Sequence, residues 1–559
     1  NGSFQSINRR YDIVYGDVML NFNYNINRFD IAATVGWTGR YENMNNMRVS
    51  TNGGLVTENW FDLNASRYTP SSTLQRMELL KTGYMGTLSL GWDNYLFLEL
   101  TGRQERSSTL KDQSFFYPSA NLSFLFTQAF HMPSWWNYGK LRLSYGIVGN
   151  APETYTANIV YEQGSDNGFT WNTIPSSWGN ADIRPEKKYE YEIGLESKFL
   201  NNRLGIDISY YNNRVKDQIL STPQPSTSGV KNVLMNVGEV ANHGWDISIS
   251  ATPILTRDFR WDLTANYGVY KNKVVKLADG VPYLEILNSG GSGIKIQAVE
   301  GQPMGDIYAQ VPQVNENGEY LVSDKGLYLN QTELQKVGNI NPAGVGGLFN
   351  SFSYKNVFLD FSIDFRIGGD VINEMNQYAT AVGLTPESLK YRDTEHGGLS
   401  YYYPGDNNSS GIPVQVDPST GAGPNGEIIY HDGIILPGVV ASTGERNTRI
   451  IPAGYYYNTT YNWGTEAEQL TYRHSVFDNS YVKLRELTIG YQFPEKMISK
   501  LGLGRLSVSV FGRNLFYFYK ALKNYDAESS VGTSWANQAT VGSSTTATRS
   551  FGVSLRASF

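Results

Sequence analysis

The sequence predicts an all-β protein, and within that class a transmembrane antiparallel β-barrel to which the chain contributes about 15 strands. Three observations support this prediction. Segments in which apolar and polar residues alternate recur from end to end, the connectors between them alternate between short and long, and aromatic residues are abundant. The 559 residues include 39 Tyr, 25 Phe, 11 Trp and 56 Gly, a mixture that suits strands with aromatic belts joined by polar turns.

Alternation with a period of two is the main local pattern. Because successive side chains of a strand point to opposite faces, such a segment has one apolar face and one polar face. The last nine residues, FGVSLRASF, place Phe551, Val553 and Leu555 on one face and Arg556 on the other. Helical periodicity is scarce, and the best short helix candidates are residues 331–338 and 385–393. The clearest alternating segments are residues 203–212, 244–253, 357–366 and 504–516.

The order of the connectors predicts which end of each strand lies on the periplasmic side and which on the extracellular side. Short and long connectors alternate over most of the chain, which is typical of outer-membrane barrels with short periplasmic turns and long extracellular loops. The alternation fails once, between residues 301 and 350, where one strand is unplaced and residues 318–329 are the candidate. The short connectors are residues 25–28, 91–94, 199–203, 253–258, 354–356 and 494–504, and the long ones are residues 41–73, 150–185, 272–293, 371–473 and 517–548.

The two faces of the strands can be assigned if the barrel lies in lipid. The apolar residues then face outward and the polar residues line a wet lumen. Alternation alone also fits a soluble β-sandwich, whose apolar faces would point inward. The connector asymmetry, the strand lengths and the charges on the polar face favour the membrane. The predicted lumen-lining residues are Asp207, Asp246, Asp360, Asp364, Arg485, Arg505, Arg513 and Arg556.

Composition and motifs argue against several other classes. The net charge of −6 lacks the basic footprint of a nucleic-acid binder, and the chain has no cysteine. Its five histidines lie far apart in the sequence, so neither a metal site nor a cofactor is predicted. No G-x-S-x-G elbow places a nucleophilic serine, and we expect no enzyme. No run of 18 apolar residues predicts a transmembrane helix.

Several stretches resemble the SusC/RagA family of TonB-dependent outer-membrane transporters. The matching pieces occur in the family's order across nearly the whole chain. The resemblance implies a plugged barrel of about 22 strands, of which residues 1–559 would be the C-terminal part, without the plug and the TonB box. The start NGSFQSINRR fits this expectation because it looks internal to a longer precursor. The matching pieces include LELTGRQERSSTL, FFYPSANLSFLF, KLRLSYGIVGN, NVGEVANHGWDISI, EGQPMGDIYA, VGNINPAGVGGLFNSFSYKNVFLDF, NSYVKLRELTIGYQFP and VSVFGRNLFYF.

The resemblance also implies a function and partners. Family members import oligosaccharides or peptides across the outer membrane of Gram-negative bacteria, which they span many times. They act with a SusD-like surface lipoprotein that forms a lid, and the TonB–ExbB–ExbD complex energises them through the region expected to precede this chain. Two alternatives stay open: a passive porin or structural outer-membrane barrel, and a soluble β-sandwich that binds glycans.

Candidate ligand-binding residues cluster in the connector 371–473, which we expect to be an extracellular insertion. Its tyrosine clusters offer flat amphipathic surfaces for sugars or peptides, although such aromatics also pack a loop or form an interfacial belt. Asn373 and Glu374 are placed near the barrel mouth by family resemblance alone. Phe559 resembles the terminal aromatic by which outer-membrane barrels are recognised for assembly. The candidate ligand residues in the tyrosine clusters are Tyr401, Tyr402, Tyr455, Tyr456 and Trp463.

Overall fold

The computed structural model is dominated by β-strands. It describes residues 2–111, 114–166, 169–289, 293–405, 411–462, 471–530, 532–542 and 547–559. The longest helix within these ranges, α3 (Ala453–Tyr461), has only nine residues. None of the helices in the described part of the chain has both the length and the apolarity needed to cross a bilayer.

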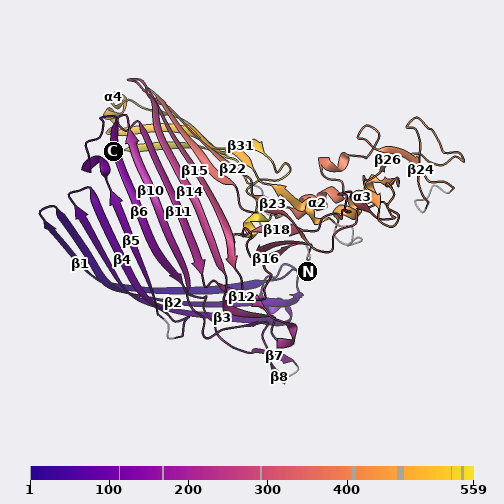
Figure 1. The fold of residues 1–559 in the computed structure, drawn as a ribbon, viewed down its shortest axis with the longest axis horizontal. Coiled ribbons are helices and arrows are strands. Elements are labelled where there is room, and N and C mark those ends of the chain that lie inside the picture. The colour runs from indigo at the N-terminus through magenta and orange to yellow at the C-terminus, as the bar shows by residue number, and fades with distance from the viewer. Residues whose placement is uncertain are drawn as a thin grey trace. The chain divides into compact units, whose positions relative to one another are not determined.

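Fifteen strands form one antiparallel sheet, and neighbours in the sheet follow one another along the chain. The predicted strand number is therefore confirmed for the described residues. Within the described part of the chain, the shorter strands form six small sheets. Figure 1 shows the long strands as arrows coloured along the chain. The 15 strands are β1 (Gln5–Ile26), β2 (Phe29–Leu55), β3 (Ser66–Trp92), β4 (Leu96–Ser107), β5 (Ser114–Phe124), β6 (Trp136–Asn150), β10 (Glu186–Phe199), β11 (Leu204–Lys216), β14 (Glu239–Leu255), β15 (Phe259–Lys276), β21 (Gly344–Tyr354), β22 (Val357–Ile367), β30 (Tyr481–Gln492), β31 (Arg505–Lys520) and β32 (Ser550–Ser558).

The chain divides into two compact units, of which unit 1 comprises residues 1–247 and 272–282. Its strands have two chemically different faces. Val18, Leu20 and Phe22 of β1 are 66%, 71% and 57% exposed, whereas Asn21 lies on the opposite face and accepts a hydrogen bond from Thr34 of β2. The apolar side chains of this strand pair therefore form no buried core. An uncovered apolar face suits a strand that meets lipid and not a soluble sandwich, which buries that face.

Unit 2 comprises residues 248–271 and 283–559, and its long strands repeat the pattern. In β32 the side chains of Phe551, Val553 and Leu555 are 75%, 72% and 68% exposed. Val553 pairs with Val510 of β31, which is itself 54% exposed. The predicted alternation of FGVSLRASF is thus present, and it gives the end of the sheet an exposed apolar face.

Tight turns join the strands in alternation with long connectors, as predicted. Asn27, between β1 and β2, has φ 53°, and Asn202, between β10 and β11, has φ 63°. This left-handed conformation is unfavourable for most side chains, but asparagine tolerates it because its short amide bonds to nearby backbone. Lys355 adopts a similar φ of 52° in the two-residue turn between β21 and β22.

Two predicted connectors differ substantially from those observed, and the predicted connector 371–473 extends over residues 368–480 in the structure. The predicted loop 41–73 is mostly strand, because β2 continues to Leu55 and β3 starts at Ser66. The backbone pairing of β2 with β3 continues beyond the part of these strands that has an apolar face. Polar residues occupy both faces there, so an alternating pattern cannot reveal the strand. The first five residues of the predicted loop 272–293 belong to β15, and the rest is part of a longer connector that spans residues 277–343.

The prediction of a further long strand between residues 301 and 350 is wrong. The candidate segment 318–329 contains only β19 (Leu321–Val322), which pairs with β27 (Val439–Val440) outside the large sheet. The strand β18 (Asp306–Ala309) also lies outside it, in a separate sheet. That sheet comprises β16 (Tyr283–Ser289), β17 (Ile294–Val299), β18 and β20 (Gln335–Asn339).

Both helix predictions also need correction. Residues 331–338 contain the start of β20, because pairing with β18 overrides the weak local preference for helix. Residues 385–393 contain only a 3₁₀ turn, Pro386–Leu389, and Tyr391 with φ 69° prevents its continuation. The sequence reasoning missed α2 (Glu374–Ala381) and α3.

The main hydrophobic core of unit 2 lies among its connectors. Ile296 from connector 277–343, Ile372 from connector 368–480 and Ala539 from connector 521–549 belong to one buried cluster. The backbone amide of Val541 also donates to the carbonyl oxygen of Ile372 over 2.8 Å. We call this cluster the connector core. It consists of Ile294, Ile296, Ile307, Ala309, Ile340, Ile372, Tyr472, Val476, Ala536 and Ala539.

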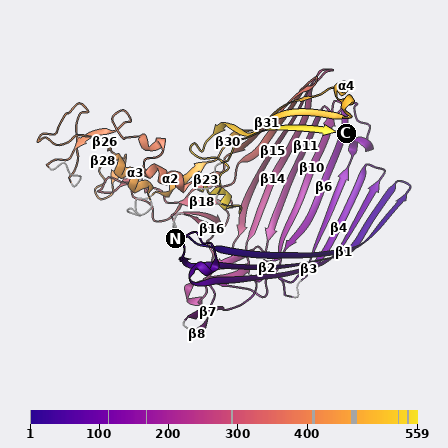
Figure 2. The same cartoon turned by 180° about the vertical axis from the view of Figure 1, so that it is seen from behind.

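The remaining elements are short. Connector 368–480 begins and ends with the strand pair β23 (Asp370–Ile372) and β29 (Val476–Asp478), and Figure 2 shows its elements β26, β28 and α3 at a distance from β30 and β31 of the same unit. The others are α1 (Phe126–Ala129), β7 (Glu162–Asp166), β8 (Phe169–Thr173), β9 (Ser177–Trp178), β12 (Ile219–Pro223), β13 (Asn232–Asn236), β24 (Leu399–Tyr402), β25 (Val414–Gln415), β26 (Tyr430–Ile434), β28 (Ile451–Pro452) and α4 (Glu495–Ile498).

Candidate functional site

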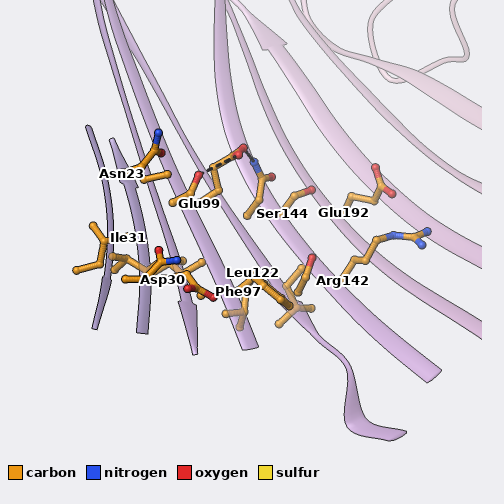
Figure 3. Close-up of a pocket in the computed structure, with 18 residues that line it drawn as sticks. Asn23, Asp30, Ile31, Phe97, Glu99, Leu122, Arg142, Ser144 and Glu192 are labelled. Carbon is orange, nitrogen blue, oxygen red and sulfur yellow. Dashed lines mark hydrogen bonds between the residues drawn. The ribbon is translucent and has the colours of Figure 1, made fainter. Parts of the chain in front are cut away.

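The polar face of unit 1 carries a pocket of about 590 Å³, within the size range of small-molecule sites. Figure 3 shows its lining, to which β1, β2, β3, β4, β5, β6 and β10 contribute. The amide of Asn121 donates to the carboxylate of Glu99 over 3.3 Å. The pocket therefore combines carboxylates, amides and one guanidinium with apolar side chains such as Phe97 and Leu122. Its polar lining side chains are Asn23, Asn25, Asp30, Ser89, Glu99, Asn121, Ser123, Arg142, Ser144 and Glu192.

Arg142 is the only cation in the described lining of this pocket, and it is held in place by the next strands. Its Nη2 lies 2.6 Å from Asp207 Oδ1 and its Nη1 lies 3.2 Å from Asp207 Oδ2. Nη2 also donates to Ser209 over 3.2 Å, and Nη1 is 3.5 Å from Glu196. A bidentate carboxylate pair fixes the plane of the guanidinium. Strand alternation predicted Asp207 but was not followed through to Arg142, which lies between Leu141 and Leu143 in the same two-residue pattern.

A second charged group lies on the polar face of unit 2. Arg485 of β30 contacts Asp364 of β22 over 2.6 Å, so these two predicted residues do come together. Arg485 also binds both carboxylate oxygens of Glu528, at 2.8 and 2.6 Å. Lys483 lies 2.6 Å from the same carboxylate. The hydrogen bonds from Arg485, supported by Lys483 and opposed by burial, lower the pKa of Glu528 to about 2.

An irregularity in β30 lets two consecutive residues serve this face. The register of the β30–β31 pair shifts between Leu484 and Glu486. Arg485 consequently reaches Asp364, while Glu486 reaches Arg513 of β31 over 3.1 Å. In a regular strand, neighbouring side chains would point to opposite faces, so the bulge re-aims one of them.

The other predicted lumen residues are not part of one cluster. Asp360 accepts a hydrogen bond from the hydroxyl of Ser351 over 2.6 Å, and Arg505 donates to Gln492 over 3.1 Å. Asp246 and Arg556 are exposed. Their assignment to a transport lumen stays a prediction.

The predicted ligand residues of connector 368–480 have different environments. Tyr401 is only 1% exposed and packs against Tyr403 and Ile450, and its hydroxyl donates to Asp432 over 3.1 Å. This position matches the packing alternative for the tyrosine clusters. Tyr402 is partly exposed, and Trp463 lies outside the described residues.

Asn373 and Glu374 lie at the start of α2. Asn373 is fully buried, and its side-chain oxygen accepts from the backbone amide of Asn376 over 3.0 Å, which caps the helix. Glu374 lies in the first turn. Tyr455 and Tyr456 lie on α3, and Phe559 is 98% exposed. Ligand roles for these residues and the assembly role of Phe559 stay predictions.

The described residues contain no group of three or more His, Cys, Asp or Glu side chains placed to hold a metal ion. The chemistry that the polar faces offer is therefore hydrogen bonding and charge pairing, from carboxylates, amides and guanidinium groups on adjacent strands. Such a face can line a water-filled passage for polar solutes.

Long antiparallel strands with an exposed apolar face and a charged opposite face define the wall of a transmembrane β-barrel. The family model for the TonB dependent receptor-like beta-barrel matches residues 1–293. The chain belongs to this family, and TonB-dependent receptors are outer-membrane proteins of Gram-negative bacteria.

Individual relatives confirm the resemblance to the SusC and RagA transporters. The chain is 24% identical over 494 residues to TonB-dependent receptor P3 of Formosa agariphila, which covers 80% of this chain and 42% of the relative. It is 30% identical over 247 residues to TonB-dependent receptor SusC of Bacteroides thetaiotaomicron, which covers 41% of this chain and 24% of SusC.

Solved structures agree on the fold. The structure of the RagAB peptide transporter superposes with a TM-score of 0.67 at 18% identity, covering 93% of this chain and 54% of that chain. The chain thus spans about half the length of this solved structure and less than half the length of the curated relatives that it matches.

Proposed function

We propose that the protein imports an organic nutrient, an oligosaccharide or a peptide, across the outer membrane of a Gram-negative bacterium. In this proposal the exposed apolar face contacts lipid, and the polar face lines the passage. A SusD-like lipoprotein covers the extracellular side, and the TonB–ExbB–ExbD complex supplies the energy. The connector 371–473 is the extracellular insertion that meets the cargo and the lipoprotein.

The observation that carries the proposal is the polar face itself. Arg142 pairs with Asp207 in unit 1, and Arg485 pairs with Asp364 in unit 2. Both pairs stand on strands whose opposite side chains are apolar and exposed, such as Leu143 at 38% and Ile489 at 48%. A soluble protein would bury those side chains, whereas a transporter needs a wet interior and an apolar exterior. Membership of the TonB-dependent receptor family supports active import over passive diffusion.

The proposal is tested by deletion of the gene in its own host. We expect the deletion strain to lose uptake of a defined oligosaccharide or peptide pool and the full-length gene to restore it. Restored uptake should stop when the proton-motive force is dissipated, because TonB draws on that force. Uptake that continues without the gene, or that persists after dissipation, would contradict the proposal.

Ion conductance distinguishes the passive alternative. If the protein is a plugged, TonB-dependent transporter, the full-length protein reconstituted in planar bilayers without an energy source should show no stable open channel. Steady conductance without an energy source would favour a porin.

A further inference from the structure

A pocket lined by five tyrosines lies in unit 2, away from the charged face of the long strands. Its volume is about 600 Å³, which fits a side chain or a short segment of a ligand. It draws Tyr328 from connector 277–343 and the other residues from connector 368–480. We call it the tyrosine pocket. It is lined by Tyr328, Pro386, Glu387, Lys390, Tyr391, Ile434, Leu436, Pro437, Tyr456, Tyr457 and Tyr461.

The pocket stands on a packed base. Ile434 and Leu436 are 4% and 3% exposed and belong to a hydrophobic cluster, and Tyr328, Tyr391 and Tyr456 pack against it. The rings are therefore fixed by packing before any ligand arrives. A preorganised site loses little side-chain entropy on binding.

Most tyrosine hydroxyls in the pocket are already paired with groups of the pocket itself. Tyr457 donates to the carbonyl oxygen of Glu387 over 2.7 Å, and Tyr328 donates to that of Pro437 over 3.2 Å. Tyr456 and Tyr461 hydrogen-bond to each other. Burial raises the pKa of Tyr457 and of Tyr328 to about 12, so both hydroxyls stay protonated and keep these bonds.

This pairing favours an apolar or aromatic side chain over a sugar, because the hydroxyl protons of the pocket are already donated. A sugar carries hydroxyls around its ring, and each buried hydroxyl without a partner opposes binding. The pocket offers such hydroxyls few uncommitted tyrosine groups, but it offers aromatic faces, two proline rings, Ile434 and Leu436. Aromatic-lined grooves of this kind accept proline and aromatic side chains of extended peptides.

Charge and backbone conformation add to the argument. Glu387 and Lys390 are the acidic and basic residues of the lining. A carboxylate accepts hydrogen bonds from peptide N–H groups, and an ammonium donates to peptide carbonyl oxygens. The Lys390 ammonium lies 4.7 Å from the centre of the Tyr391 ring. Tyr391 has φ 69°, a left-handed conformation that tyrosine rarely adopts. Such outliers gather at ligand-binding positions.

We propose that the tyrosine pocket binds a cargo peptide by taking up one of its aromatic or proline side chains. The inference rests on the proposed import function, since it names the peptide as cargo and selects one of the two nutrient classes left open there. It adds a specific binding position on the connectors, separate from the charged faces of the strands.

Calorimetric titration of the purified full-length protein in detergent tests the proposal. The probe is the blocked hexapeptide GSYPSG, with GSASSG and maltoheptaose as comparison ligands. The Tyr391→Gly variant removes one ring, and glycine favours the observed φ, so the local backbone is not strained by the change. Tyr378→Ala is the matched control, because Tyr378 lies on α2 of the same connector and is 41% exposed but does not line the pocket.

We expect GSYPSG to bind the unmodified protein and Tyr378→Ala equally, and to bind Tyr391→Gly about tenfold more weakly. Lys390→Ala, a second variant that leaves the packed base intact, should weaken binding by a smaller factor. Equal binding of GSYPSG to Tyr391→Gly and the unmodified protein would overturn the proposal. So would absence of binding by the unmodified protein, or binding of maltoheptaose that Tyr391→Gly abolishes.

The titration needs neither TonB nor transport, which separates it from the test of import. A deletion strain that still takes up peptides would contradict the proposed function and leave the binding result standing. Equal peptide binding by Tyr391→Gly and the unmodified protein would contradict the proposed peptide site and would not affect the proposal of import.

Discussion

Lys483 of β30 and Glu528 of connector 521–549 form an ion pair with 2.6 Å between Nζ and Oε2, and only 2% of the lysine side chain is exposed. The same ammonium lies 4.7 Å from the centre of the Tyr517 ring. The backbone carbonyl of Ala527, next to Glu528, accepts from Asn479 over 2.9 Å. The connector is therefore tied to the strand through a charge that has almost no access to water.

Glu528→Gln should loosen connector 521–549. It removes the counter-charge of a buried ammonium, and since 32% of the glutamate side chain is exposed, water softens the loss to about 1–3 kcal/mol. Hydrogen exchange of residues 521–530 in the full-length protein measures the change. Glu486→Gln is the control, because its partner Arg513 is 57% exposed and such pairs contribute about 0–1 kcal/mol. Equal exchange in both variants would argue against a connector held by Glu528.

The same connector should loosen in acid. The hydrogen bonds from Arg485 hold the pKa of Glu528 at about 2, below the ordinary value of 4.5. A carboxylate whose pKa is lowered by folding stabilises the structure above its unfolded pKa, and this contribution is lost as the pH falls through the folded pKa. Protection of residues 521–530 should thus decline between about pH 4.5 and pH 2. The decline should be smaller in Glu528→Gln, and an identical decline in that variant would show that another group is responsible.

Arg142 and Asp207 should be energetically coupled. A double-mutant cycle with Arg142→Met and Asp207→Asn isolates their interaction. We expect a coupling energy of about 0.5–1.5 kcal/mol, because the pair is bidentate but its side chains are 27% and 41% exposed. Arg142→Lys should recover only part of it, since an ammonium cannot bind both carboxylate oxygens in the same plane. Urea unfolding of the refolded full-length protein in micelles gives each value, and full recovery by lysine would exclude the bidentate geometry as the cause.

Gly490 should resist replacement by alanine. A β-carbon there would clash with Cζ of Phe358, its partner across β22 and β30. The ring must shift, at a cost of about 1–3 kcal/mol, which urea unfolding in micelles would report. Gly16→Ala in β1 is the control because no atom lies within 4 Å of its added carbon. Phe358→Leu should rescue Gly490→Ala, and failure of that rescue would place the cost in the backbone.

The long strands could be predicted from the sequence because their pattern is local. Residues 357–366 alternate apolar and polar side chains, and β22 covers almost the same range, Val357–Ile367. Asp364 and Arg485 were both assigned to the polar face by the same rule, and they are in contact. What alternation could not supply was the third partner, Glu528, which lies in a connector without periodicity.

The connectors were harder to predict because tertiary contacts determine them. Ile296 and Ile372 lie in short apolar stretches, Ile294–Val299 and Val371–Ile372, and only their packing with Ala539 shows that they form one core. Residues 331–338 carry a weak helical pattern, yet pairing with β18 makes part of them a strand. The tyrosines of α3 have no clear apolar spacing, and the helix starts after Pro452 without a side-chain cap, so no start signal was visible.

The connector core also constrains how such a protein can evolve. Three stretches of sequence that are separated by long strands share one buried cluster. An insertion or deletion in one of them changes the packing of the other two, so natural variants should change all three together or exchange them as a block. Recombination that swaps a single connector between relatives would then yield misfolded chimaeras more often than recombination that exchanges all three.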